Sequence, residues 1–319
     1  MSNDASTPNS QVTLVMDVGG THTRLALAWP ANGRARLSAV EVVSTPRGQL
    51  HEVMRQFLAR HAAPPLAAIA IAAAGRVRRL PGRTNVSLTN LALGIEREEL
   101  QASFSVPRVH LVNDLAAIAA ALPWLADADL ARVGGSRAAV PGHRLVVGIG
   151  TGFGAAALTA DGHLLETEAG HADLAAVSAS ERQWLDQLAP LGRCSVEQVL
   201  SGPGLLRLHE VIAQKPLALH EELRAAHAKG DAAALRTLSA FSIWLGRTVG
   251  NLVLSHGAWG GVLLAGGVLE RLGDAFDGKA FRQGFEDKAP FSADLAAVPV
   301  WQMRHPQPAL LGLARLAVA

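Results

Sequence analysis

Short apolar runs alternate with glycine, proline and polar turns along the chain, and this pattern predicts an α/β protein. Three strands are expected at 12–17, 24–29 and 36–43, with turn chemistry at 30–33 between the last two. A helix at 49–61 and a buried strand at 67–72 follow. Beyond an irregular segment rich in Gly, Arg and Pro, the pattern predicts a helix at 95–103, a strand at 109–112 and a helix at 115–122.

A second set of three strands begins at Arg144. These strands are expected at 144–149, 155–158 and 163–168, and each set carries a turn with glycine and threonine after its first strand. The remaining pattern is mainly helical, with helices expected at 179–188, 196–200, 204–212, 220–228, 232–255 and 309–317, and with late strands at 262–265 and 298–303. We therefore predict two similarly built α/β domains, related by an internal duplication that residue identity does not reveal.

Composition narrows the class of protein. A chain of 319 residues with 49% hydrophobic and 18% charged residues is globular and long enough for two domains. Its net charge of +2, without a long basic block, argues against nucleic-acid binding, and the arginines at 76, 78 and 79 are interpreted as a solvated loop. The single cysteine excludes an internal disulfide or a cysteine-rich zinc site. With no membrane-length apolar run and no secretory signal, a cytoplasmic protein is expected.

The segment Asp17-Val18-Gly19-Gly20-Thr21 has the composition of a phosphate-binding turn. Glycines let backbone N–H groups approach an anion, and the threonine adds a hydroxyl donor. The aspartate can hold a magnesium ion or its water. An ordinary hairpin with a Gly-Gly turn is the alternative.

The segment Gly150-Thr151-Gly152-Phe153-Gly154 is a second candidate for phosphate binding. It also fits the glycine fingerprint of a dinucleotide-binding domain, but that turn must open a long helix. Here a short apolar run reaches another tight turn at Asp161-Gly162, which predicts a hairpin.

Asp114 is the strongest catalytic candidate, because it follows a buried strand and precedes a helix. Ligands of open α/β sheets bind at the carboxyl ends of the strands, where this carboxylate is expected. The helix dipole favours its ionised form, and a weak base can suffice for phosphoryl transfer, in which the proton leaves late. The alternative is that Asp114 only caps the helix.

Three further segments suit a polyhydroxylated ligand or a nucleotide. Glu168 and His171 flank a turn of small residues, and a capping box predicted just before 196–200 places Glu197 in the first turn of that helix. Gly266-Gly267 follows a late strand and would let an adenosine pack against backbone. Each segment alone is equally consistent with an ordinary surface loop or helix end.

Taken in order, these segments resemble the actin/hexokinase/Hsp70-type ATPase superfamily, and most closely the bacterial glucokinase family. The resemblance covers nearly the whole chain after residue 11 and includes the segments 88–90, 112–114, 196–204 and 284–288. It implies an α/β, two-lobed actin-like ATPase (ribonuclease H-like) fold with a cleft, each lobe being a mixed sheet flanked by helices. The implied small domain is 1–112 plus 305–319, and the large domain is 113–304.

The same resemblance implies ATP-dependent phosphorylation of D-glucose at its 6-hydroxyl, with Asp114 as general base. The implied sugar-binding residues are Asn90, Asn113, Asp114, Glu168, His171 and Glu197. The implied ATP-binding residues are Asp17, Val18, Gly19, Gly20, Thr21, Gly150, Thr151, Gly152, Gly266 and Gly267, with Mg²⁺ near Asp17, through water. Glucose or a related hexose is the expected partner, without nucleic acid or membrane, and the chain is expected to form a homodimer.

Three residues depart from the pattern of the family. His22 follows Thr21 where asparagine is usual, Ala169 replaces a glycine, and Leu93 stands where a tryptophan is expected. These departures leave open a second hypothesis, a non-catalytic sugar-binding regulator of the same fold. A third hypothesis, an NAD-dependent oxidoreductase built on the turn at 150–155, is disfavoured by the hairpin context.

Overall fold

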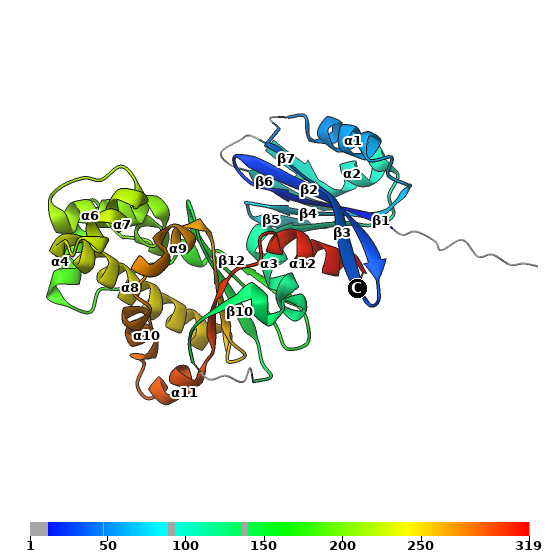
Figure 1. Ribbon diagram of the computed structural model, residues 1–319. Coiled ribbons are helices and arrows are strands. Elements are labelled where there is room, and N and C mark those ends of the chain that lie inside the picture. The colour runs from blue at the N-terminus through cyan, green and yellow to red at the C-terminus, as the bar shows by residue number, and fades with distance from the viewer. Residues whose placement is uncertain (1–11, 47, 89–92, 136–139, 319) are drawn as a thin grey trace, which may run out of the picture. The chain divides into compact units, whose positions relative to one another are not determined.

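The computed structural model describes residues 12–46, 48–88, 93–135 and 140–318, and the chain forms two compact units (Figure 1). The first unit extends to Leu125 and also contains Pro306–Ala319, and the second is Ala126–His305. The sequence had placed residues 113–125 in the large domain. They belong to the first unit because α3 (Asp114–Ala121) packs against the C-terminal helix α12 (Pro308–Val318).

The first unit is built on a five-stranded sheet in the order β3-β2-β1-β4-β8. Its strands are β1 (Val12–Val18), β2 (His22–Ala31), β3 (Arg34–Ser44), β4 (Leu66–Ala73) and β8 (Val109–Asn113). The first three strands are antiparallel, whereas β4 and β8 run parallel to β1. The carboxyl ends of β1, β4 and β8 therefore meet at one edge.

The two faces of this sheet differ in the size of their side chains. Large residues such as Leu14 and Met16 pack with α1 (Leu50–Arg60) and α2 (Arg97–Phe104). The other face carries buried alanines at Ala26, Ala28, Ala68, Ala70 and Ala72. Helices α3 and α12 lie on the side of the sheet opposite α1 and α2 (Figure 1). Small side chains on that face allow both helices to approach closely.

The expected irregular segment is instead a three-stranded antiparallel sheet, so this prediction was wrong. Its strands are β5 (Val77–Leu80), β6 (Arg83–Leu88) and β7 (Leu93–Glu96). Ile95, expected at a helix start, is a buried strand residue that pairs with Val86. The helix begins at Arg97, where the Glu98 carboxylate accepts the backbone N–H of Thr84 at 3.0 Å and ties the helix to β6.

The second unit contains a six-stranded sheet in the order β12-β11-β10-β13-β14-β9. Its strands are β9 (Leu130–Gly134), β10 (Arg144–Ile149), β11 (Phe153–Leu158), β12 (Leu164–Thr167), β13 (Val262–Ala265) and β14 (Val300–Met303). Strands β10 to β12 are antiparallel, and β13 and β14 run parallel to β10. Five strands thus repeat the order and directions of the first unit, which confirms the predicted duplication. The antiparallel strand β9 was not predicted, and β14 begins two residues later than expected, after Pro299.

Helices account for most of the remaining second unit. They are α4 (Ala179–Leu188), α5 (Val196–Val199), α6 (Gly202–Ala213), α7 (His220–Ala228), α8 (Ala232–His256), α9 (Gly267–Leu272), α10 (Gly278–Glu286) and α11 (Ser292–Ala297). The long helix α8 packs tightly against α10, since a Cβ at Gly246 would lie 1.9 Å from the Phe281 carbonyl oxygen. A Cβ at Gly284 would lie 2.2 Å from the Ile243 oxygen, so the motif at 284–288 begins with a packing residue. In the part of the chain described, no helix has the length and apolarity to cross a membrane.

Candidate active site

The predicted residues of the first unit gather at the carboxyl edge of its sheet. Val18 of β1 and Asn113 of β8 both pair with Ala73 of β4, which lies between them. The Ala74 N–H donates to the Val18 carbonyl at 3.3 Å, and Asn113 Nδ2 donates to the Gly75 carbonyl at 3.3 Å. The turn after β4 is therefore hydrogen-bonded to the ends of both β1 and β8. The turns that follow these three strands begin side by side.

The turn after β1 is a tight turn between the antiparallel strands β1 and β2. The Gly19 N–H donates to the His22 carbonyl at 3.0 Å, and Thr45 Oγ1 donates to the Gly19 carbonyl at 2.7 Å. Gly20 and Thr21 are exposed, and nothing lies within 4 Å of the position of a Cβ on Gly20. The turn thus presents open backbone to a ligand. Thr45 was not predicted from the sequence. Its only distinguishing feature there is its position as a hydroxyl residue directly after the end of β3.

Asp17 lies on the alanine-lined face, opposite Arg24 of β2. Arg24 Nη1 is 3.1 Å from Asp17 Oδ2, and the Asp17 side chain is 16% exposed. Burial raises the pKa of Asp17, while the charge and hydrogen bond of Arg24 act against that rise. Mg²⁺ in phosphoryl-transfer sites takes one or two carboxylates together with substrate phosphates, and Asp17 beside the phosphate turn fits that donor set.

The N-cap of α3 is Asn113, so the alternative that Asp114 only caps this helix is wrong. Asn113 Oδ1 and Asp114 Oδ1 both accept the Leu115 N–H, each at 2.9 Å. Burial and the charge of Asp17 raise the pKa of Asp114 to about 6, although the Leu115 N–H lowers it. The helix start was expected to keep Asp114 a weak base. The raised pKa instead lies near neutral pH, where a general base is most effective.

In the second unit, the turn after β10 is fixed by Glu197. Its Oε2 accepts the Phe153 N–H at 2.9 Å, and a Cβ on Gly152 would lie 2.4 Å from the same oxygen. The Gly150 N–H donates to the Gly152 carbonyl at 2.9 Å, and the Gly150 carbonyl accepts the Gly202 N–H at 2.8 Å. The capping box before α5 is confirmed, and it places Glu197 in the first turn.

The same turn joins antiparallel strands, with Ile149 paired to Phe153. The predicted hairpin is therefore confirmed, and a dinucleotide-binding turn, which needs a following helix, is excluded at this position. Thr151 is exposed at the tip of the turn.

Glu168 precedes a 3₁₀ turn, Ala169–His171, beside this hairpin, and His171 is the last residue of that turn. The His171 N–H donates to the Glu168 carbonyl at 3.0 Å, and both residues are exposed. Gly170 is buried against β11, because its Cβ would lie 2.1 Å from the Phe153 carbonyl oxygen and 3.5 Å from Glu197 Cβ. The structure thus brings the predicted sugar ligands Glu168, His171 and Glu197 together.

Gly266 and Gly267 follow β13, the strand beside β10. Gly266 has φ +100°, and its Cβ would lie 2.3 Å from the Ile149 carbonyl oxygen, so a side chain is excluded there. Ala265 pairs with Gly148, which places these glycines next to the Gly150 turn.

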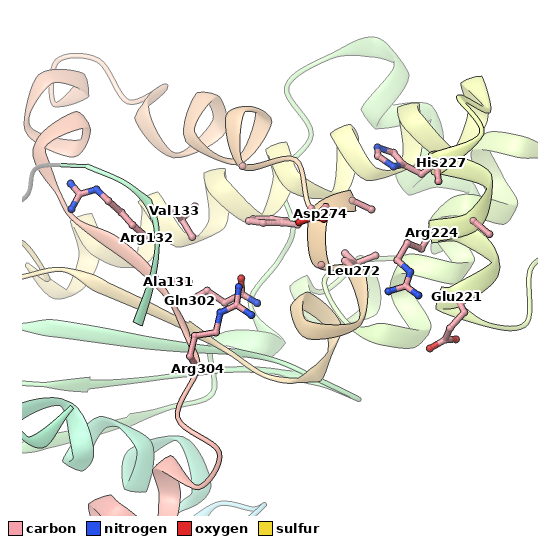
Figure 2. Close-up of a pocket in the computed structure, with 16 residues that line it drawn as sticks. Ala131, Arg132, Val133, Glu221, Arg224, His227, Leu272, Asp274, Gln302 and Arg304 are labelled. Carbon is pink, nitrogen blue, oxygen red and sulfur yellow. The ribbon is translucent and has the colours of Figure 1, made fainter. Parts of the chain in front are cut away.

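A cavity of about 1010 Å³ opens in the second unit beyond the carboxyl end of β14 (Figure 2). Arg304, which follows β14, and Arg224 of α7 lie on opposite sides of it, and residues 272–276, from the last residue of α9 onward, form another wall. His220, at the start of α7, contacts the Gly202 carbonyl at 3.0 Å through Nε2, and Gly202 bonds Gly150. The start of α7, a helix that lines the cavity, is therefore hydrogen-bonded through Gly202 to the glycine turn. Sequence reasoning missed its lining residues, because they come from distant segments without a shared motif.

Asn90 lies outside the described residues. Leu93 is the first residue of β7.

Two sheets of matching strand order, each with a glycine turn after its first strand, are the arrangement of the actin-like ATPase fold. Residues 14–319 match the family model described as Glucokinase. A glucokinase from Yersinia pestis (strain Pestoides F) is 37% identical over an alignment of 311 residues, and the match covers 94% of this chain and 94% of that chain. The chain belongs to the glucokinase family, as the resemblance predicted.

Solved structures agree with this assignment. The crystal structure of glucokinase from an Antarctic psychrotroph is 29% identical with a TM-score of 0.82, and the match covers 96% of this chain and 98% of that chain. A ROK family glucokinase from Streptomyces griseus, in complex with glucose and AMPPNP, has a TM-score of 0.61 at 18% identity, with 96% and 98% covered. This second likeness shows the fold alone.

Proposed function

We propose that this protein transfers the γ-phosphoryl group of ATP to the 6-hydroxyl of D-glucose. The observation that carries the proposal is the edge of the first sheet, where the phosphate turn after β1 and Asp114 after β8 are separated by one strand. A phosphoryl donor and a general base must lie close together for this reaction.

Asp114 is proposed as the base. It accepts a hydrogen bond from the sugar O6–H and orients that oxygen toward the γ-phosphorus. The proton passes to the carboxylate late, as the bond to the leaving ADP loosens. Asn113 caps α3 and donates to the Gly75 carbonyl, so it also holds the base in position.

The remaining sugar hydroxyls are assigned to Glu168, His171 and Glu197, and to Asn90 and Asn113. The first two have exposed side chains available to a ligand. The Glu197 carboxylate already accepts the Phe153 N–H and can accept further hydrogen bonds, because each carboxylate has about four acceptor sites.

We assign the ATP phosphates to the turns at 18–21 and 150–152, and the adenosine to Gly266-Gly267 and to the cavity whose wall includes Leu272 at the end of α9. The guanidinium groups of Arg224 and Arg304 suit an aromatic base, because planar guanidinium stacks on ring faces. Magnesium bound with the nucleotide neutralises charge on the phosphate oxygens, and Asp17 would hold it through water. A neighbour of the same fold, the Streptomyces griseus glucokinase, binds an ATP analogue.

A coupled assay of ADP release over a panel of hexoses tests the proposal. Magnesium-dependent turnover with glucose is expected. If glucose raises the melting temperature but no hexose is turned over, the protein is instead a non-catalytic sugar-binding regulator. A homodimer and a cytoplasmic location also remain proposals, and light scattering of the purified protein tests the first.

A further inference from the structure

The turn after β4 lies between the phosphate turn and the proposed base, and neither of those assignments uses it. Its backbone is bonded to both neighbours, through the Ala74 N–H to Val18 and the Gly75 carbonyl to Asn113. A Cβ on Gly75 would lie 2.6 Å from the Ser87 carbonyl oxygen, so this position accepts only glycine and the turn is held in place. The backbone from which the next residue extends is therefore fixed in position.

That next residue is Arg76, which is exposed. No hydrogen bond or ion pair joins its guanidinium to the residues that the structure describes. Nearby arginines differ, since Arg24 is paired with Asp17 and Arg83 with Glu96. Among the described residues, Arg76 is thus a cation without a charged partner on the turn that lies between the turns after β1 and β8, where a highly charged donor would bind.

A guanidinium group suits this position, because its planar set of N–H donors matches two oxygens of a phosphate. The group also stays charged over the whole pH range in which enzymes work. Phosphoryl transfer spreads negative charge over three equatorial oxygens, and fixed positive charge there lowers the barrier. A cation between the phosphoryl donor and the sugar hydroxyl would stabilise the negative charge on those oxygens.

We propose that Arg76 is a further catalytic residue, which contacts the phosphoryl group in transit and then the 6-phosphate of the product. The proposal rests on the proposed function. In the step, the O6–P bond forms while the bond from phosphorus to the ADP oxygen breaks, and the O6 proton moves to Asp114. Arg76 keeps its own proton throughout.

The test compares Arg76→Ala and Arg76→Gln with Arg76→Lys and with the control Arg78→Ala. Arg78 is also exposed, two residues further along on β5, and has no assigned role. For both neutral variants we expect kcat to fall about 10- to 100-fold, with the glucose Kd from calorimetry unchanged. Inhibition by glucose 6-phosphate should weaken about tenfold, since one charge-assisted contact is lost. The lysine variant should retain an intermediate kcat, and the control should match the wild type.

Wild-type kcat and wild-type product inhibition in Arg76→Ala or Arg76→Gln would overturn the inference. An equal loss in Arg78→Ala would also overturn it, because the effect would then be one of general surface charge. The proposed function fails separately, if the wild-type protein itself turns over no hexose.

Discussion

Opposing effects act on the pKa of the Asp114 carboxyl group. Burial and the negative charge of Asp17 raise its pKa, whereas the Leu115 N–H lowers it, with a result of about 6. The group is therefore mostly ionised at neutral pH and still basic enough to accept a proton.

Replacing Asp114 by alanine should lower kcat about 10²- to 10⁴-fold, the usual contribution of a general base. Glucose binding should persist, because other side chains hold the remaining hydroxyls. Calorimetry and the coupled assay measure the two effects. Asp127→Ala, at an exposed acid of the second unit, is the control, and equal kcat values for the two variants would remove Asp114 from catalysis.

The raised pKa also predicts the pH dependence of activity. Because only the ionised base accepts the proton, kcat/KM should be level above about pH 7 and fall through an apparent pKa near 6. Initial rates between pH 5 and 8 test this expectation. A profile that stays level down to pH 5 would contradict it.

The same group should oppose stability at alkaline pH. The folded pKa of about 6 exceeds the ordinary value of 3.8, so the stabilising contribution of the protonated form is complete below about pH 4 and is lost as pH rises through 6. Asp114→Asn, which stays neutral, should therefore raise the free energy of unfolding at pH 8 by about 1–3 kcal/mol, and the gain should shrink toward pH 4. Urea unfolding at both pH values measures it, and a less stable variant at pH 8 would be the wrong sign.

For single residues, the sequence indicated which side chains could take part in the reaction, but not how the fold shifts their pKa values. Asp114 was identifiable because a strand ends and a helix begins there. Its pKa depends on Asp17, which is distant along the chain and is brought close by the sheet. Arg76 belongs to no motif, and only the pairing of β4 with β1 and β8 gives it a role.

Among the elements, α12 is the one that fixes the helix of the proposed base. Gly312 of α12 meets α3 so closely that an added Cβ would lie 1.8 Å from the Ala117 carbonyl oxygen. The C-terminal segment is therefore part of the scaffold that positions Asp114.

Gly312→Ala should force the two helices apart and lower the free energy of unfolding by about 1–3 kcal/mol, as overpacking does. Activity should fall as well, because α3 moves with its first residue. Gly94→Ala is the matched control, since nothing lies within 4 Å of its added Cβ. Thermal melts of the two variants should differ, and coincident melting temperatures would show that this contact does not limit stability.

Element prediction succeeded where apolar periodicity was strong, as in β1, β10 and the long helix α8. It failed at β5 to β7, because these short strands are rich in arginine and broken by glycine and proline. Tertiary bonds hold them in place, including that from the Thr84 N–H to Glu98. The strand β9 was missed because its antiparallel partner β14 lies far along the chain.

At the scale of the whole molecule, two units share one sheet order, and each has a glycine turn after its first strand. The duplication was predictable because both openings repeat the same succession of strands and turns. The limit of the first unit was not, since it depends on α12 returning to pack against α3.

The most direct test of the proposed activity is ADP release by the purified protein with glucose, ATP and Mg²⁺, with the product identified by glucose 6-phosphate dehydrogenase. We predict glucose-dependent formation of ADP and glucose 6-phosphate in equal amounts. We also predict its loss in Asp114→Ala. Folded wild-type protein that binds glucose but forms neither product would contradict the proposal.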